Sequence, residues 1–230
     1  MENENTIIEM FMDLCRIHSP SFNEKMTAEY CCEKLMQLGF DVLEDGASSK
    51  AGGNQDNIVA CIEGPYTSLP PVMINAHMDT VDPGGDIEPV IDGDRIRSAG
   101  NTILGADNRA GIVMILAGMT EVVKSLDRYG RIEVVLTIGE EAGLHGARYL
   151  DYSLIKAKHG FSLDSSGLGR IGIGAPYYNA IDVHVKGRSA HAAVNADQGI
   201  NAVVLMSRLI SSVEFGKLDD ETTSNVGVIK

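Results

Sequence analysis

Two residues with metal-binding chemistry, His77 and Asp79, follow an apolar run that begins at Pro71. Side chains two positions apart on a strand point to the same side, so one of the pair can bind a metal ion while the other orients it. Ligand sites of open α/β sheets lie beyond the carboxyl ends of the strands. The spacing therefore predicts a candidate metal site where this strand ends.

Four carboxylates further along the chain occupy comparable positions. Asp107 lies at an expected helix start, Glu140 and Glu141 follow the apolar run at 132–138, and Asp164 ends a third short strand. Nitrogen and oxygen ligands of this kind suit zinc, cobalt or manganese. Two such ions can stabilise both the attacking and the leaving oxygen of a hydrolysis, so the set is typical of metal-assisted hydrolysis.

Each of these features also has an ordinary structural explanation. An isolated His-x-Asp is mostly coincidence, and paired glutamates usually belong to the solvated surface. Asp107 can favour a helix N-terminus through the helix dipole, and Asp164 can end a strand for turn reasons. Their joint placement favours the metal, because three apolar strands each end in a histidine or a carboxylate. Carboxylates are costly to bury without a charged partner.

The apolar patterning predicts the elements that must position these residues. Helical spacing marks a first helix at 7–17, and a second helix ends before Gly39. A buried helix is expected after position 110. Short strands alternate with these helices, which predicts an α/β fold with a mostly parallel sheet flanked by helices. The expected strands are 40–43, 57–62, the run that leads to His77, 132–138 and 161–164, with a hairpin at 87–96.

The pattern changes near Tyr177 and Tyr178. Apolar and polar residues alternate over 180–186, as in a half-exposed antiparallel strand. An amphipathic helix is expected at 199–213 and a further strand from position 226. The change predicts a domain boundary between residues 177 and 178.

Composition and charge exclude several classes of protein. The chain has 230 residues, of which 44% are hydrophobic, and a net charge of −13. Such an acidic balance argues against a nucleic-acid partner. Four cysteines without a C-x-x-C motif fit free thiols in a reducing compartment. The N-terminus lacks the order of a signal peptide, and the longest apolar run, 110–119, is too short for a membrane span. We therefore expect a cytoplasmic protein without a membrane partner.

The sequence resembles metallopeptidase family twenty of clan MH, which contains peptidase T, carboxypeptidases, aminoacylases and succinyl-diaminopimelate desuccinylase. The stretch Leu104–Gly111 is most similar to the peptidase T-like branch, which more often has Asp-Lys where this chain has Asn108 and Arg109. The resemblance covers essentially the whole chain and rests on motifs in a fixed order. They are Ser19-Pro20-Ser21 with Glu24, His77-Met78-Asp79-Thr80-Val81, Gly105-Ala106-Asp107, Glu140-Glu141-Ala142-Gly143 and Asp164.

The resemblance implies a zinc-exopeptidase-like fold and two divalent ions, with zinc expected and cobalt or manganese as alternatives. His77 and Asp164 would bind one ion, Glu141 would bind the other, and Asp107 would bridge them. The implied reaction removes the N-terminal residue from short peptides, as a tripeptidase does. A dipeptidase, an N-acyl-amino-acid deacylase or a desuccinylase remains an alternative within the same chemistry.

The resemblance also implies roles for three further residues. Asp79 would hydrogen-bond His77 and fix its tautomer. Glu140 would be the general base, which takes a proton from the attacking water and returns it to the leaving amine. His191, in Gly187-Arg188-Ser189-Ala190-His191-Ala192, would help to bind the substrate carbonyl.

The resemblance assigns 1–177 to the N-terminal part of a catalytic metallopeptidase domain and 178–230 to an incomplete lid or dimerisation domain of α+β, ferredoxin-like fold. A homodimer would form through this smaller domain. Full-length relatives continue beyond position 230, and their returning segment carries a second metal histidine. We therefore expect the second ion to bind weakly or not at all here, and an inactive fragment is the alternative to an active peptidase.

Overall fold

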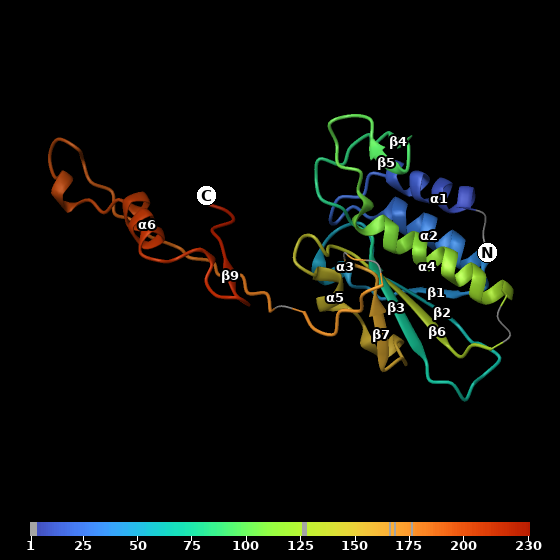
Figure 1. The fold of residues 1–230 in the computed structure, drawn as a ribbon. Helices are drawn as coiled ribbons and strands as arrows, with labels where there is room; N and C mark the ends of the chain where they lie inside the picture. Colours follow the sequence, from blue (N-terminus) through green and yellow to red (C-terminus); the bar gives the residue numbers. More distant parts are fainter. Residues whose placement is uncertain (1–3, 126–127, 166, 168, 176) are drawn as a thin grey trace. The chain divides into compact units, whose positions relative to one another are not determined.

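The computed structural model describes residues 4–125, 128–165, 167, 169–175 and 177–230 (Figure 1). The chain divides into two units, Met1–Leu168 and Gly169–Lys230, and each is described by itself. The division lies nine residues before the boundary expected between 177 and 178. The assignment of the two parts to a catalytic and a lid domain stays a prediction.

A five-stranded mixed sheet lies at the centre of the first unit, with its strands in the order β1-β2-β6-β3-β7. β3 pairs in parallel with both β6 and β7. β2 is antiparallel to both β1 and β6. The strands are β1 (Asp41–Glu44), β2 (Ile58–Ile62), β3 (Val72–His77), β6 (Ile132–Thr137) and β7 (His159–Ser162).

The α/β fold with flanking helices is confirmed, but parallel pairing is confined to the part of the sheet around β3. The expectation of a mostly parallel sheet has to be corrected in the other half. The connection from β2 to β3, 63–71, holds no helix. A parallel crossover needs a dozen or more residues, so this short connection cannot bring β3 into the sheet parallel to β2.

Three long helices cover the sheet, and Figure 1 shows them together on one side of it. They are α1 (Glu4–Arg16), α2 (Lys25–Gln37) and α4 (Ala106–Ser125). Leu14, Leu35 and Leu116 are fully buried where these helices meet the core. Each buried leucine contributes about 1.5–3 kcal/mol through the removal of apolar surface from water.

The remaining elements of the first unit are short. The hairpin expected at 87–96 is confirmed, with its turn at Gly93 and Asp94. A short helix, α3, lies between β1 and β2. These elements are α3 (Ser48–Ala51), β4 (Pro89–Asp92), β5 (Arg95–Ser98), α5 (His145–Tyr149) and the 3-10 turn η1 (Tyr152–Leu154).

The second unit has little regular structure. It contains η2 (Ala196–Gln198), α6 (Ala202–Ser211), β8 (Gly216–Lys217) and β9 (Thr223–Ser224). Residues 180–186 and 226–229 do not form the strands that we expected. A strand needs a hydrogen-bonded neighbour, and neither segment pairs with another strand within residues 177–230. The ferredoxin-like character of this region therefore stays a prediction.

None of the helices in the described parts of the chain is long and apolar enough to cross a membrane.

Glu133 is a fully buried carboxylate in the middle of the sheet. It accepts hydrogen bonds from the Arg131 side chain at 2.5 Å and from the backbone N–H groups of Lys156 and Ala157 at 3.0 Å. Burial alone would raise the pKa of Glu133, but these hydrogen bonds and the charge of Arg131 outweigh burial and hold the pKa below its usual range. The ionised form is therefore part of the folded state.

Replacing Glu133 by glutamine is expected to lower the free energy of unfolding at pH 7 by about 1–3 kcal/mol, because buried donors lose their charged acceptor. The folded pKa lies below the unfolded value of about 4.3, so the stabilisation is present above that value and is lost as the pH falls through the folded pKa. Urea denaturation should show a wild-type advantage that shrinks from pH 7 toward pH 3. An advantage that does not change with pH would contradict this, and the exposed Glu29→Gln is the matched control.

Candidate metal centre

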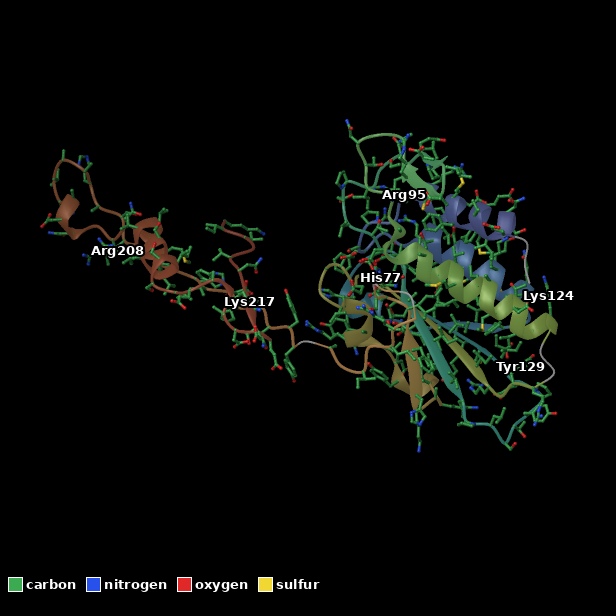
Figure 2. All side chains as sticks on the ribbon, in the orientation of Figure 1. His77, Arg95, Lys124, Tyr129, Arg208 and Lys217 are labelled. Atoms are coloured by element: carbon green, nitrogen blue, oxygen red, sulfur yellow. The ribbon has the colours of Figure 1, made fainter. Side chains whose placement is uncertain are left out.

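The three parallel strands end at one edge of the sheet and deliver the predicted residues there. β3 ends at His77, which is aligned with Thr137 at the end of β6. Glu140 and Glu141 follow β6, and Asp164 follows β7. Figure 2 shows His77 at the end of β3. Because the carboxyl ends of parallel strands meet at one edge, residues far apart in the sequence come together.

His77 lies at the centre of these residues and is only 3% exposed. Its Nε2 atom is 3.0 Å from Asp107 Oδ1, 3.8 Å from Asp164 Oδ1 and 3.9 Å from Glu140 Oε2. Two overlapping groups of ligand atoms result, each within 4.8 Å. One group is His77, Asp107 and Asp164, and the other is His77, Glu140 and Glu141. The first group is the set that the sequence predicted for one ion.

The opposite ring nitrogen of His77 is held by Asp79. Nδ1 lies 2.9 Å from the backbone oxygen of Asp79 and 3.3 Å from its Oδ1. A proton on Nδ1 therefore has its acceptors, and Nε2 faces the carboxylates. Burial alone would lower the pKa of His77, but the hydrogen bond with Asp79 and the charges of Asp79, Asp164 and Glu140 outweigh it and raise the pKa to about 9.

Asp79 also fixes the turn that follows β6. Its carboxylate is fully buried and accepts the N–H groups of Glu140 at 2.9 Å and Glu141 at 3.1 Å. The Ser21 hydroxyl donates to the same carboxylate at 2.6 Å. Burial would raise the pKa of Asp79, and the hydrogen bonds with His77, Ser21 and the Glu140 N–H lower it below its usual value. Asp79 thus orients His77 and both glutamates at once.

The carboxylates of the centre repel one another. Burial raises the pKa of Glu140, Glu141 and Asp164, His77 lowers each of them, and the neighbouring carboxylates raise them again. Partly buried carboxylates at this density are costly without a compensating positive charge. One imidazole with several carboxylate oxygens is the donor set of zinc, cobalt or manganese sites. The residues present therefore fit a divalent cation.

Asp107 reaches the centre from the start of α4. Asp107 and Asn108 have non-helical backbone angles, so the regular helix begins after them. The Asp107 side chain is 71% exposed. It lies within hydrogen-bond distance of His77 although the two residues are 30 positions apart.

Arg109, whose role we did not predict, anchors this segment. Its side chain is 1% exposed and donates to the backbone oxygens of Leu14 at 2.6 Å, Gly105 at 3.2 Å and Ile17. Gly105 has φ of +70°, and a Cβ there would lie 2.1 Å from the Arg109 guanidinium. The only feature of the sequence that drew attention to Arg109 was the presence of Asn108 and Arg109 where the peptidase T-like branch more often has Asp-Lys.

The first motif, Ser19-Pro20-Ser21 with Glu24, lies just before α2. Ser21 and Asn23 both have side chains that can cap a helix. The N-cap residue is Glu24, which makes no side-chain hydrogen bond to its own helix. The hydroxyl of Ser21 donates to Asp79 instead, so the motif supports the candidate centre.

A cavity of about 200 Å³ adjoins the centre. His77, Glu140 and Asp164 line it, together with apolar side chains that include Met73 and Leu150. The candidate centre therefore borders a partly apolar space.

His191 lies in the second unit. Its N–H donates to Asn195 Oδ1 at 2.7 Å, and its Nδ1 accepts from the Ala193 N–H at 3.2 Å. It is exposed and is not among the residues brought together in the first unit. Its role in substrate binding stays a prediction.

Comparison with known proteins supports a peptidase. A family model described as peptidase family M28 matches residues 57–205. The chain is 37% identical to the protein YqjE of Bacillus subtilis over 99% of this chain and 61% of that relative. It is 28% identical to peptidase T of Pectobacterium carotovorum over 85% of this chain and 54% of that relative. The chain thus spans little more than half the length of these curated relatives.

Two solved structures share the fold. They are a tripeptidase from Staphylococcus aureus and the aminopeptidase PepT from Bacillus cereus, with TM-scores of 0.79 and 0.77. Each is 30% identical to this chain, and each match covers 98% of this chain and 61% of the solved one. The motifs predicted family twenty, and the matching model is described as family M28. The names peptidase T and tripeptidase are those of the branch that the motifs predicted. The chain belongs to peptidase family M28, and it is similar to peptidase T and to tripeptidases.

Proposed function

We propose that this chain carries the active centre of a metal-dependent aminopeptidase that removes the N-terminal residue from short peptides, most like a tripeptidase. The observation that supports it best is the position of His77 Nε2, 3.0 Å from Asp107 and 3.8 Å from Asp164, beside Glu140. The similarity to proteins named peptidase T, tripeptidase and aminopeptidase supports the substrate class.

In this proposal His77 and Asp164 would hold one zinc ion, Asp107 would be a ligand of both ions, and Glu141 would hold a second ion that we expect to bind weakly. The proximity of Asp107 to the His77 ring supports the first part of this assignment. When bound, the ions would polarise the scissile carbonyl and lower the pKa of water. Cobalt and manganese accept the same nitrogen and oxygen ligands.

Glu140 is the proposed general base. It would take a proton from the attacking water and return it to the leaving amine. Burial raises the pKa of Glu140 above its ordinary value, which brings it closer to the range in which a carboxylate can both accept and return a proton. Asp79 would hold the tautomer of His77 and, through the N–H of Glu140, the position of the base.

The second unit would contribute His191 to substrate binding and would form a homodimer interface. A cytoplasmic location is part of the proposal. A curated relative, 32% identical over 72% of this chain, is named cytosol non-specific dipeptidase, which supports this location. The net charge of −13 agrees with the absence of a nucleic-acid partner in the proposal.

Hydrolysis of free and N-acetylated trialanine by the purified protein, loaded with zinc, cobalt or manganese, tests the proposal. We expect release of the N-terminal alanine from the free tripeptide only, loss of activity with a chelator, and recovery when the metal is restored. Dialanine and acetylalanine distinguish the related activities. Cleavage of acetylalanine but not of trialanine would assign a deacylase, and no hydrolysis with any of the three metals would contradict the proposal.

A further inference from the structure

Glu24 is a buried carboxylate for which the proposed chemistry has no role. It is fully buried, and its Oε1 accepts the N–H of Phe22 at 2.8 Å and of Gly139 at 2.9 Å. Its Oε2 is buried and has no hydrogen-bond partner within the described parts of the chain. The bond to Gly139 joins residues 115 positions apart, so it links the start of α2 to the turn after β6.

Glu24 and Asp79 together bind three consecutive backbone N–H groups. Glu24 accepts from Gly139, and Asp79 accepts from Glu140 and Glu141. Hydrogen bonds from N–H groups to a carboxylate are stronger than those to a neutral acceptor. The turn that carries both glutamates of the centre is thus held along its backbone by two carboxylates that lie outside the two metal-binding groups.

The contacts of Glu24 point to the turn rather than to its own helix. Glu24 occupies the N-cap position of α2 but makes no side-chain cap hydrogen bond there. Gly139 has φ of +54°, and a Cβ on it would lie 3.1 Å from the Phe22 ring. Phe22 itself donates its N–H to Glu24. The segment 22–24 and the turn at 139 therefore form one packed unit behind the centre.

We propose that Glu24 is a positioning residue that fixes the backbone of the turn and thereby the side chains of Glu140 and Glu141. The inference rests on the proposed function, in which Glu140 is the base and Glu141 a metal ligand. Without the Glu24 carboxylate the Gly139 N–H has lost its acceptor, and the turn is held by Asp79 alone. The glutamates then sample positions in which proton transfer and metal binding are less favourable.

Glu24→Leu, Glu24→Gln and the exposed control Glu29→Leu on the same helix test this role. Three quantities are compared: amide hydrogen exchange at residues 139–141 in the metal-free protein, zinc affinity by calorimetry, and kcat and KM for trialanine. Glu24→Leu should speed exchange at these amides at least tenfold and lower kcat and zinc affinity by roughly 10–100-fold, as loss of a supporting hydrogen bond does at metal sites. KM should change less than about threefold, because no substrate contact is removed.

Glu24→Gln should lie between wild type and Glu24→Leu in each quantity, because its amide oxygen can accept the same two N–H groups but carries no charge. A folded Glu24→Leu protein with wild-type exchange, affinity and kcat would overturn the inference. So would a variant that only loses thermal stability, which is the result expected of a residue that merely stabilises the fold. If Glu24→Leu does not fold, Glu24→Asp, which is one methylene shorter, replaces it with the same expectations.

Failure of the proposed function looks different. If the wild-type protein hydrolyses no peptide with any metal, the proposed function is contradicted. The role of Glu24 can still be tested in that case, because the amide exchange rates at 139–141 are measured in the metal-free variants. Wild-type hydrolysis of trialanine together with unchanged exchange in Glu24→Leu contradicts the role of Glu24 alone.

Discussion

Replacing Glu140 by glutamine is expected to lower kcat for trialanine by roughly 10²–10⁴-fold, because the amide cannot take up the proton of the attacking water. KM should change little, since substrate binding does not depend on that proton. The Glu140 N–H bond to Asp79 involves only the backbone and should survive the change. Steady-state kinetics of the zinc-loaded protein measure the effect.

Metal content decides between two roles for Glu140. The possible ligand atoms of Glu140, His77 and Glu141 lie within 4.8 Å of one another in the structure. Glu140 could therefore be a metal ligand instead of the general base. If Glu140 is the general base, the glutamine variant should keep the wild-type amount of zinc. Loss of zinc together with loss of activity would identify Glu140 as a ligand. Glu88→Gln, exposed in the connection before β4, is the matched control and should keep both.

Replacing Asp107 by asparagine should have the largest effect on metal binding. Asp107 is proposed to contact both ions, so the amide should weaken zinc affinity by at least about 100-fold, the upper end of the effect of supporting residues. Its side chain is 71% exposed, so the fold does not depend on it. Removal of one negative charge from a cluster of repelling carboxylates should leave the metal-free protein as stable as the wild type, or more so.

Thermal unfolding with and without zinc separates these effects. A ligand that binds only the folded state stabilises it, by about 2.7 kcal/mol at a concentration of 100 times its dissociation constant. The wild type should show this zinc-dependent rise in Tm, and Asp107→Asn should lose most of it. An unchanged rise in the variant would remove Asp107 from the metal centre. Asp94→Asn, exposed in the β4–β5 hairpin, should behave like the wild type.

Local patterning in the sequence was enough to predict the strands that carry the centre. The apolar runs that end at His77 and near Glu140 and Asp164 form β3, β6 and β7, which pair in parallel and meet at one edge. A parallel arrangement requires that residues following such strands come together. The proximity of His77, Glu140 and Asp164 could therefore be expected, whereas the grouping of Asp107 with His77 and Asp164 rested on the family resemblance.

Pairing partners were harder to predict, because they depend on the rest of the sheet. Whether β2 runs parallel or antiparallel to β6 depends on the connection that follows it, and apolar patterning does not report direction. In the second unit, alternation at 180–186 met the pattern of a strand, but the segment has no neighbouring strand to pair with in residues 177–230. The hydrogen bonds of a strand join it to another segment of the chain, so a single segment cannot form a strand on its own.

By itself, the sequence determined the order of the motifs and which side chains could bind a metal ion, because residue type decides which atoms can act as ligands. Only the tertiary structure decided what holds those side chains in place. Ser21 binds Asp79 rather than capping α2, and Glu24 binds the Gly139 N–H from 115 positions away. Arg109 anchors the Asp107 segment to α1. The partner of a buried polar group is chosen by long-range packing, and no local pattern encodes it.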